Sequence, residues 1–99
     1  MIICLDYDDT YTRDPHLWDS FISNAKMRNH TVICVTMRYE SEGKEVKQYL
    51  EGLVDNIYFT NREAKKQFLD KLNIFPHVWI DDQPLWIFYD SKEEENVSG

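Results

Sequence analysis

Five aspartates fall in two short clusters of this chain, and carboxylates at such close spacing call for a counter-ion. The clusters are Asp6, Asp8 and Asp9 near the start and Asp81 and Asp82 near the end. The formal charge of the 99 residues is −7. These two clusters and the segment 92–95 account for the whole excess, and the rest of the chain is balanced. Mg²⁺ prefers carboxylate oxygens as protein ligands, so the clusters are candidate ligands for such an ion.

Each cluster follows an apolar run of the kind that forms a central strand of a parallel sheet. Met1–Leu5 precedes the first cluster, and His77–Ile80 precedes the second. Thr31–Thr36 and Ile57–Phe59 are predicted as two further strands, and Leu85–Tyr89 is a candidate fifth. Ligands of open α/β sheets bind at the carboxyl ends of the strands. The polar residues at those ends are the candidate functional residues, namely Asp6, Asp8, Thr36 and Asp81.

Amphipathic helices are predicted between these strands. Asp14 followed by Pro15 is a helix cap with proline in the first turn. Thr60 and Glu63 match the capping-box pattern that opens a helix. The residues expected to face inward are Leu17, Trp18, Phe21, Ile22 and Ala25 in the first helix, Val46, Tyr49, Leu50, Leu53 and Val54 in the second, and Ala64, Phe68 and Leu72 in the third.

Strands that alternate with helices predict a three-layer, Rossmann-like α/β sandwich with a mostly parallel sheet of four or five strands. Only residues 11–13 separate Thr10 from the helix cap at Asp14, and few residues follow Thr36 before the next helix. Neither loop has room for an inserted domain. We expect one domain over residues 1–90 and an acidic, disordered tail over residues 91–99.

Composition narrows the class of protein. No apolar stretch approaches the ~18 residues of a membrane-spanning helix, and the N-terminus does not resemble a signal peptide, so we expect a cytoplasmic protein with no membrane partner. The negative charge argues against stable binding to duplex DNA. Cys4 and Cys34 lie in apolar runs and are expected to be buried free thiols in adjacent strands, although two cysteines could also pair. The three histidines lack zinc-ligand spacing.

Four segments carry a resemblance to a known family. Residues 2–10 read Ile-Ile-Cys-Leu-Asp-Tyr-Asp-Asp-Thr, an apolar strand followed by Asp-x-Asp-x-Thr. Residues 32–38, 65–69 and 78–82 follow in order. Together they resemble the four motifs of the haloacid dehalogenase-like (HAD) phosphohydrolase superfamily over residues 2–82. The resemblance implies a capless, Mg²⁺-dependent phosphomonoester hydrolase that forms an aspartyl-phosphate intermediate.

The same resemblance implies a role for each candidate residue. Asp6 would be the nucleophile and Asp8 the acid–base group. Lys65 and Lys66 are alternatives for the lysine that binds the phosphate. The implied catalytic residues are Asp6, Asp8, Thr36 and Lys65; the substrate-binding residues are Thr10, Arg38 and Lys66; and the metal ligands are Asp6, the backbone carbonyl of Asp8, Asp81 and, in support, Asp82.

Other interpretations remain open at this stage. The same scaffold could be a catalytically silent module that binds Mg²⁺ or a partner. A phosphoacceptor receiver domain is a third class, but its phosphorylated aspartate ends the third strand, where this chain has Thr60. The expected substrate is a nucleotide or the phosphorylated end of a macromolecule such as a nucleic acid. Three tyrosines flank the predicted site and are either packed or form a stacking rim for a base: Tyr7, Tyr11 and Tyr39.

Overall fold

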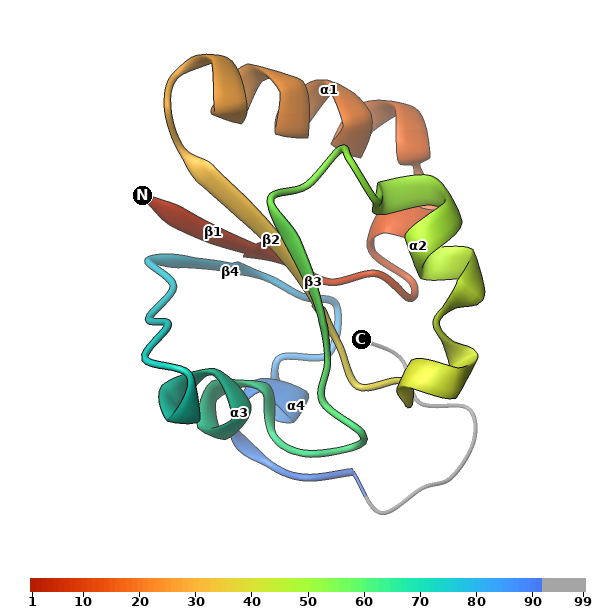
Figure 1. The fold of residues 1–99 in the computed structure, drawn as a ribbon, viewed down its shortest axis with the longest axis vertical. Coiled ribbons are helices and arrows are strands. Elements are labelled where there is room, and N and C mark those ends of the chain that lie inside the picture. Colours follow the sequence, from red (N-terminus) through yellow and green to blue (C-terminus); the bar gives the residue numbers. More distant parts are fainter. Residues whose placement is uncertain (92–99) are drawn as a thin grey trace.

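The computed structural model describes residues 1–91, in which strands and helices alternate along the chain (Figure 1). The strands are β1 (Ile2–Leu5), β2 (Thr31–Thr36), β3 (Asn56–Phe59) and β4 (Val78–Ile80). The helices are α1 (Pro15–Met27), α2 (Lys44–Leu50), α3 (Lys65–Lys71) and α4 (Leu85–Phe88), with short 3-10 turns at Tyr11–Arg13 and Glu40–Glu42.

Within this part of the chain the strands form one all-parallel sheet in the order β3-β2-β1-β4. Leu5 of β1 is in register with Cys34 of β2 and Ile80 of β4. The amide of Asp6 extends this ladder by donating to the carbonyl of Ile80 at 3.0 Å. The two acidic clusters therefore follow neighbouring strands and meet at one edge of the sheet. The predicted α/β fold with a mostly parallel sheet is confirmed.

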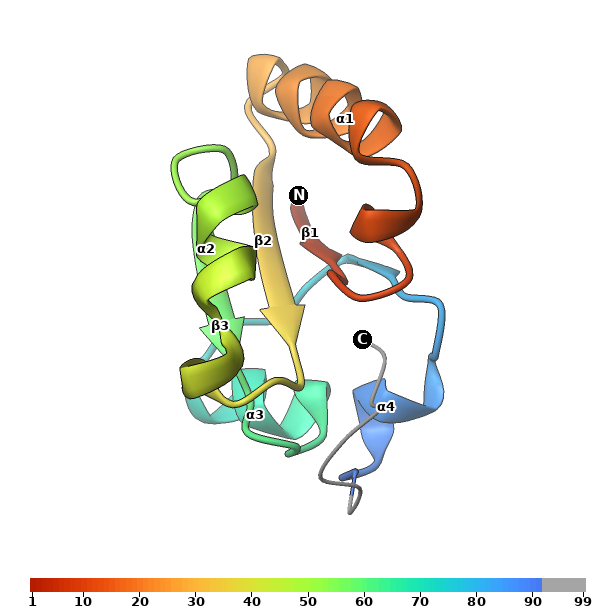
Figure 2. The same cartoon turned by 90° about the vertical axis from the view of Figure 1, so that its right-hand side faces the viewer.

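Helices cover both faces of the sheet, and alternate strand residues supply the two apolar layers (Figure 2). One core joins β1 and β2 to α1 and α2, and the other joins the same strands to α3. This alternation gives the three-layer sandwich. The strand residues of the first core are Ile3, Leu5, Val32 and Cys34, and those of the second are Cys4, Ile33 and Val35. Both cysteines are buried free thiols, as predicted.

The prediction of a fifth strand at Leu85–Tyr89 is wrong, because Leu85–Phe88 forms helix α4. A short run of apolar residues does not distinguish a strand from a buried helix by its pattern. Pro84 precedes the helix with φ −58° and ψ −22°, a helical conformation that proline's fixed φ favours. Ile87 is buried, and α4 packs against α3.

The predicted capping box at Thr60 and Glu63 is also wrong. Helix α3 begins at Lys65, after Ala64, with no side-chain cap. The Thr60 hydroxyl is buried and has no hydrogen-bond partner among residues 1–91. Asn61 and Arg62 have φ values of 55° and 72°, so a tight left-handed turn follows β3 and delays the helix.

Helix α1 begins as predicted, since the side chain of Asp14 accepts a hydrogen bond from the amide of Leu17 at 3.2 Å. In all three helices, however, the helical spacing predicted more inward-facing residues than the structure has. The second helix ends at Leu50, so two of its predicted members, Leu53 and Val54, lie beyond it. Three residues that were predicted to face inward are exposed: Leu17, Tyr49 and Leu72.

The end of the described chain packs onto the core. Ser91, which the sequence placed in the tail, is buried, and its amide donates to the carbonyl of Arg62 at 2.8 Å. The remaining residues of the expected tail, 92–99, lie outside the described residues. Within residues 1–91, no helix has the length and hydrophobicity needed to cross a membrane.

Candidate active site

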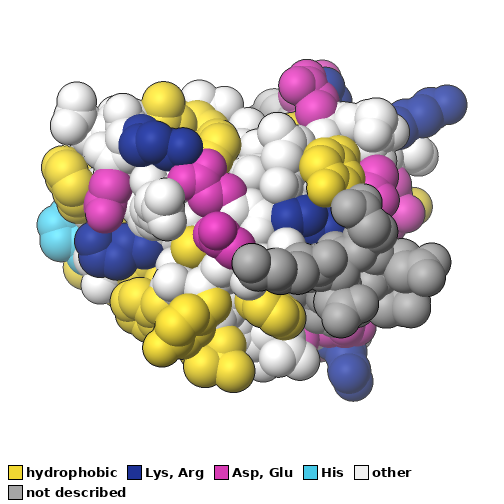
Figure 3. Space-filling model, turned by 90° about the horizontal axis from the view of Figure 1, so that it is seen from below, with side chains coloured by type: hydrophobic (Ala, Val, Ile, Leu, Met, Phe, Trp, Pro, Cys, Tyr) yellow, Lys and Arg dark blue, Asp and Glu magenta, His cyan; other side chains and the backbone are white. Residues whose placement is uncertain are grey.

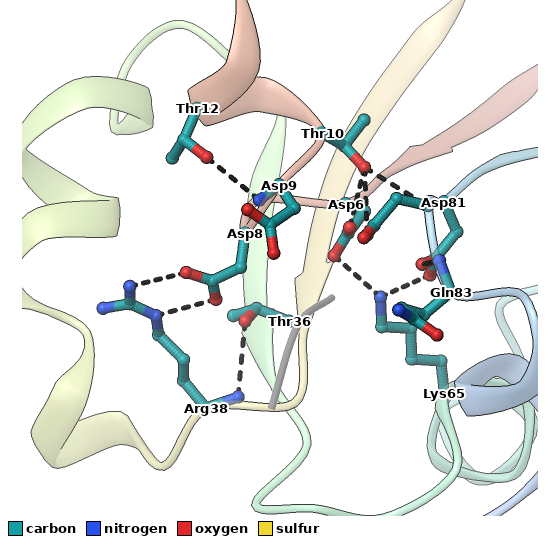
Figure 4. Close-up of polar contacts among 11 residues, drawn as sticks. Asp6, Asp8, Asp9, Thr10, Thr12, Thr36, Arg38, Lys65, Asp81 and Gln83 are labelled. Carbon is teal, nitrogen blue, oxygen red and sulfur yellow. Dashed lines mark hydrogen bonds and ion pairs between the residues drawn. The ribbon is translucent and has the colours of Figure 1, made fainter. Parts of the chain in front are cut away.

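The candidate site lies where β1, β2 and β4 end and α3 begins (Figure 4). Asp6 and Asp81 are the first residues after β1 and β4, and Lys65 is the first residue of α3. The sheet order explains the meeting, because parallel strands end at the same edge. Residues from three of the four motif segments thus share one location.

Lys65 bridges the two acidic clusters. Its Nζ donates to Oδ1 of Asp6 at 3.0 Å and to Oδ2 of Asp81 at 2.5 Å. Its side chain is only 1% exposed. Lys66, the alternative phosphate lysine and a predicted substrate-binding residue, lies on the surface and pairs with Asp70 at 3.0 Å. Consecutive helix residues point in different directions, so only Lys65 reaches the cluster, and the expectation for Lys66 is corrected.

Thr10 holds Asp6 from the other side. Its hydroxyl donates to Oδ2 of Asp6 at 2.8 Å and accepts from the amide of Asp82 at 3.2 Å. Thr10 was predicted to bind substrate, but in the structure it links Asp6 to the second acidic cluster. With Lys65 on one oxygen and Thr10 on the other, the Asp6 carboxylate has a fixed orientation.

Burial dominates the electrostatics of this cluster. It raises the pKa of Asp6 to about 8, against the opposing effect of the Lys65 ammonium. It likewise raises the pKa of Asp81, and the same ammonium opposes the change. Burial alone would lower the pKa of Lys65, but the two carboxylates raise it above its ordinary value. The lysine is therefore charged, whereas burial favours the protonated forms of Asp6 and Asp81 unless a further cation compensates them.

Three carboxylates are close enough to share one ion. Asp6, Asp81 and Asp82 each offer an oxygen, and these oxygens lie within 4.8 Å of one another. All three are hard oxygen donors, the type that Mg²⁺ binds. Asp8 is the fourth acid of the site, and only Lys65 and Arg38 pair with the four. Among the described residues, the four carboxyl groups in their ionised forms would exceed the charge of Lys65 and Arg38 by two, which matches a divalent cation.

Asp8 forms a separate, two-pronged ion pair with Arg38. Nε of Arg38 donates to one oxygen of Asp8 at 2.9 Å, and Nη2 donates to the other at 2.7 Å. Bidentate pairs of this type are among the strongest side-chain hydrogen bonds. The resemblance implies that both residues act directly on substrate, as acid–base group and anion binder. In this structure their side chains bind each other.

The Arg38 guanidinium is held on its other sides as well. Nη1 donates to the carbonyl of Glu42 at 2.8 Å, and the guanidinium carbon lies 5.2 Å from the centre of the Tyr7 ring. Tyr7 in turn donates to Glu45 at 2.5 Å and stacks on Tyr11 with ring centres 5.8 Å apart. Tyr7 and Tyr11 are both buried, which favours packing over a role as a stacking rim for a base.

Thr36 ends β2 between these two groups of residues (Figure 4). It is fully buried, and its hydroxyl accepts from the amide of Arg38 at 3.3 Å. A hydroxyl also has a proton to donate, so Thr36 retains the capacity to bind a phosphate oxygen, the role that the sequence predicted.

Sequence reasoning missed the residues that support the loops. Arg62 is buried, donates to the carbonyl of Met37 at 2.9 Å and lies 4.7 Å from the Tyr39 ring centre. It also pairs with Glu42 at 3.4 Å. These contacts join the loop after β3 to the loop after β2, which carries Arg38. No spacing pattern marks such residues, because their partners are distant in the sequence.

The strands end toward the face that Figure 3 shows, where Asp6 and Lys65 themselves are buried. Figure 3 shows acidic and basic side chains side by side across this face, with hydrophobic side chains gathered at its lower left. Helix α4 exposes Leu85 and Phe88 by 64% and 61%. Among residues 1–91, no cap domain interrupts the short loops after β1 and β2.

Comparisons of the chain with family models, curated proteins and solved structures find no significant match.

Proposed function

We propose that this protein is a Mg²⁺-dependent phosphomonoester hydrolase with Asp6 as the nucleophile, the reaction that the resemblance to HAD phosphohydrolases implies. The observation that carries the proposal is the buried meeting of Asp6, Asp81 and Lys65 at the ends of two neighbouring strands. Burial of one ammonium with several carboxylates is costly for a protein to maintain, and such groups with shifted pKa values are concentrated at functional sites.

The residues present fit Mg²⁺. Asp6, Asp81 and Asp82 supply closely spaced carboxylate oxygens. In their ionised forms these three would exceed the charge of Lys65 by two, which matches the charge of the ion. A bound Mg²⁺ would offset the charge of the incoming phosphate and of the phosphate in the transition state. Without such a cation the acidic clusters would repel the substrate.

In the first step, an oxygen of Asp6 forms a bond to phosphorus while the bond between phosphorus and the ester oxygen breaks. The electron pair of the broken bond leaves with the ester oxygen. This oxygen takes a proton from Asp8, which must first separate from Arg38 and take up that proton from water. Lys65 and the Thr36 hydroxyl stabilise the charge on the phosphate oxygens. The products are an alcohol and a phosphorylated Asp6.

In the second step, a water molecule attacks the phosphorus of phosphorylated Asp6. The Asp8 carboxylate takes the proton of this water, and the bond from phosphorus to Asp6 breaks. Inorganic phosphate leaves, Asp6 is regenerated, and Asp8 again carries a proton.

A cytoplasmic location is part of the proposal, supported by the two buried cysteines that remain unpaired.

The test is phosphate release from a panel of substrates with Mg²⁺ or with EDTA. The panel contains an aryl phosphate, 5′- and 3′-mononucleotides, a phosphopeptide and a 3′-phosphorylated oligonucleotide. We expect release that needs Mg²⁺ and falls about 10⁴-fold or more in Asp6→Asn. Asp70→Asn removes a carboxylate from a surface ion pair and is the matched control, with activity unchanged.

A second readout separates metal binding from turnover. Mg²⁺ should raise the melting temperature of the wild-type protein, and Asp81→Asn should lose most of this increase. Stabilisation by Mg²⁺ without hydrolysis of any panel member would contradict the proposed enzyme and favour a binding module. Absence of both effects would reject the metal site as well.

A further inference from the structure

The ion pair between Asp8 and Arg38 has a consequence for substrate choice, which rests on the function proposed above. Both oxygens of Asp8 accept hydrogen bonds from the guanidinium, at 2.7 and 2.9 Å. An acid–base group must present one oxygen to the leaving group or to water. Asp8 therefore has to separate from Arg38, at least in part, before it can transfer a proton.

Arg38 is the more firmly held member of the pair. The carbonyl of Glu42 binds its Nη1, and the buried ring of Tyr7 lies against the guanidinium. Asp8, by contrast, pairs through its side chain with Arg38 and lies in the loop after β1. Separation is therefore expected through movement of the Asp8 side chain, which leaves the guanidinium in place with its bidentate edge free.

The vacated edge suits an oxyanion. A guanidinium binds carboxylate and phosphate oxygens with the same two-pronged geometry. The side chains of Arg38 and Asp8 are 22% and 20% exposed, so a ligand can reach the pair from solvent. If Asp8 left and no other anion took its place, the half-buried guanidinium of Arg38 would lose its main partner. A neutral ligand is therefore a poor replacement for Asp8.

The position of Arg38 shows which part of a substrate could supply that anion. In Figure 4, Arg38 and Lys65 lie at opposite ends of the site, with Asp6 and Thr36 between them. The reacting phosphate must contact Asp6 next to Lys65. An anion on Arg38 is therefore a second group of the substrate, separate from the phosphate that is hydrolysed.

We propose that Arg38 selects phosphomonoesters that carry a second phosphate or carboxylate. The second anion replaces Asp8 on the guanidinium, and this exchange frees the Asp8 carboxylate to take up a proton from solvent water and to pass it to the leaving oxygen. Arg38 is thus a specificity-determining residue, and a substrate with one anionic group leaves Asp8 in its resting pair.

The kinetic test uses matched substrates that differ only in the second anion. The pairs are phosphoglycolate with 2-hydroxyethyl phosphate, 3-phosphoglycerate with glycerol 3-phosphate, and adenosine 3′,5′-bisphosphate with 3′-AMP. We expect kcat/KM to be at least about 10-fold higher for the second-anion member of one or more pairs. Arg38→Gln should reduce that ratio to about 2 or less, and Arg38→Lys, which keeps charge without the planar fork, should give an intermediate ratio. A ratio near 1 in every pair, or one retained by Arg38→Gln, would overturn the proposal.

A binding test separates this proposal from the proposed function, because it needs no turnover. Calorimetry measures the affinity of each second-anion compound for Asp6→Asn and for Asp6→Asn combined with Asp8→Asn. If the anion competes with Asp8, removal of the competitor should tighten binding about 5-fold or more. Asp6→Asn combined with Asp9→Asn makes the same charge change at the adjacent residue and should tighten binding less. Equal tightening by the two double variants would contradict the exchange. If the wild type hydrolyses no substrate but the binding test gives the expected result, only the proposed hydrolase is rejected.

Discussion

Nζ of Lys65 lies 3.0 Å from Oδ1 of Asp6, and the two side chains are 1% and 0% exposed although 59 positions separate them in the chain. This pair connects the first turn of α3 to the end of β1. It places a permanent positive charge beside the residue proposed as nucleophile. Because both groups are buried, the loss of either one leaves a charge without compensation.

Lys65→Met should therefore destabilise the protein strongly. It leaves Asp6 and Asp81 without their shared ammonium, and breaking a buried ion pair costs about 3–5 kcal/mol. Urea unfolding at neutral pH gives the free energy of unfolding directly. Lys66→Met is the control, since its pair with Asp70 is at the surface and contributes about 1 kcal/mol or less. Similar losses in the free energy of unfolding of both variants would show that the Lys65 ammonium does not compensate the buried carboxylates.

Gly43→Ala should destabilise the start of α2 through a direct clash. A Cβ at this position would lie 2.4 and 2.5 Å from two ring atoms of Phe59. Overpacking of this kind costs about 1–3 kcal/mol. Phe59→Leu in the same chain removes the ring and should recover part of the loss. Gly52→Ala meets no atom within 4 Å, so at φ +85° it should show only the backbone cost of about 1 kcal/mol.

Thr60→Val should be neutral or should stabilise the protein by up to about 1 kcal/mol. The Thr60 hydroxyl is buried without a partner among residues 1–91, and a methyl group removes its desolvation cost at nearly the same volume. Thr36→Val at the end of the neighbouring strand loses the hydrogen bond from the Arg38 amide and should cost about 1 kcal/mol. Thermal unfolding of the two variants compares them directly. A large loss in Thr60→Val would reveal a partner for this hydroxyl.

Stability should fall at high pH because of two buried tyrosines. Burial, followed by the hydrogen bond to Glu45, raises the pKa of Tyr7 above its ordinary value of 10.0. Burial and the hydrogen bond to Asp19 do the same for Tyr11. Since the unfolded chain loses these protons first, their contribution is complete below pH 10 and is lost as the pH rises toward the folded-state values.

The measurement is the free energy of unfolding between pH 8 and pH 11, with tyrosinate absorbance followed in parallel. Tyr7→Phe and Tyr11→Phe should each make the alkaline decline shallower, because phenylalanine has no proton to lose. Tyr89→Phe alters an exposed side chain and serves as the control, with the slope unchanged. An unchanged slope in Tyr7→Phe would show that this hydroxyl ionises equally in the folded and unfolded chain.

Local patterns were sufficient for most of the fold. The range of β2 matches its apolar run, and Asp14 with Pro15 marks the start of α1, because these signals depend on residues adjacent in the chain. The same reasoning failed at α3 and at α4. At α3, the left-handed turn at Asn61 and Arg62 took the place of the predicted cap. At α4, an apolar run was compatible with either a strand or a helix, and packing on α3 decided between the two.

For the candidate site, the sequence alone determined which chemical groups were available: two acidic clusters, a threonine at a strand end, and one of two adjacent lysines. It also indicated that they belong at strand ends. Only the tertiary structure decided that Lys65 and not Lys66 reaches Asp6, and that Arg38 pairs with Asp8. Both outcomes depend on helix direction and strand order, which bring residues 59 and 30 positions apart into hydrogen-bond distance. A linear pattern carries no information on such contacts, because they are formed by the packing of separate elements.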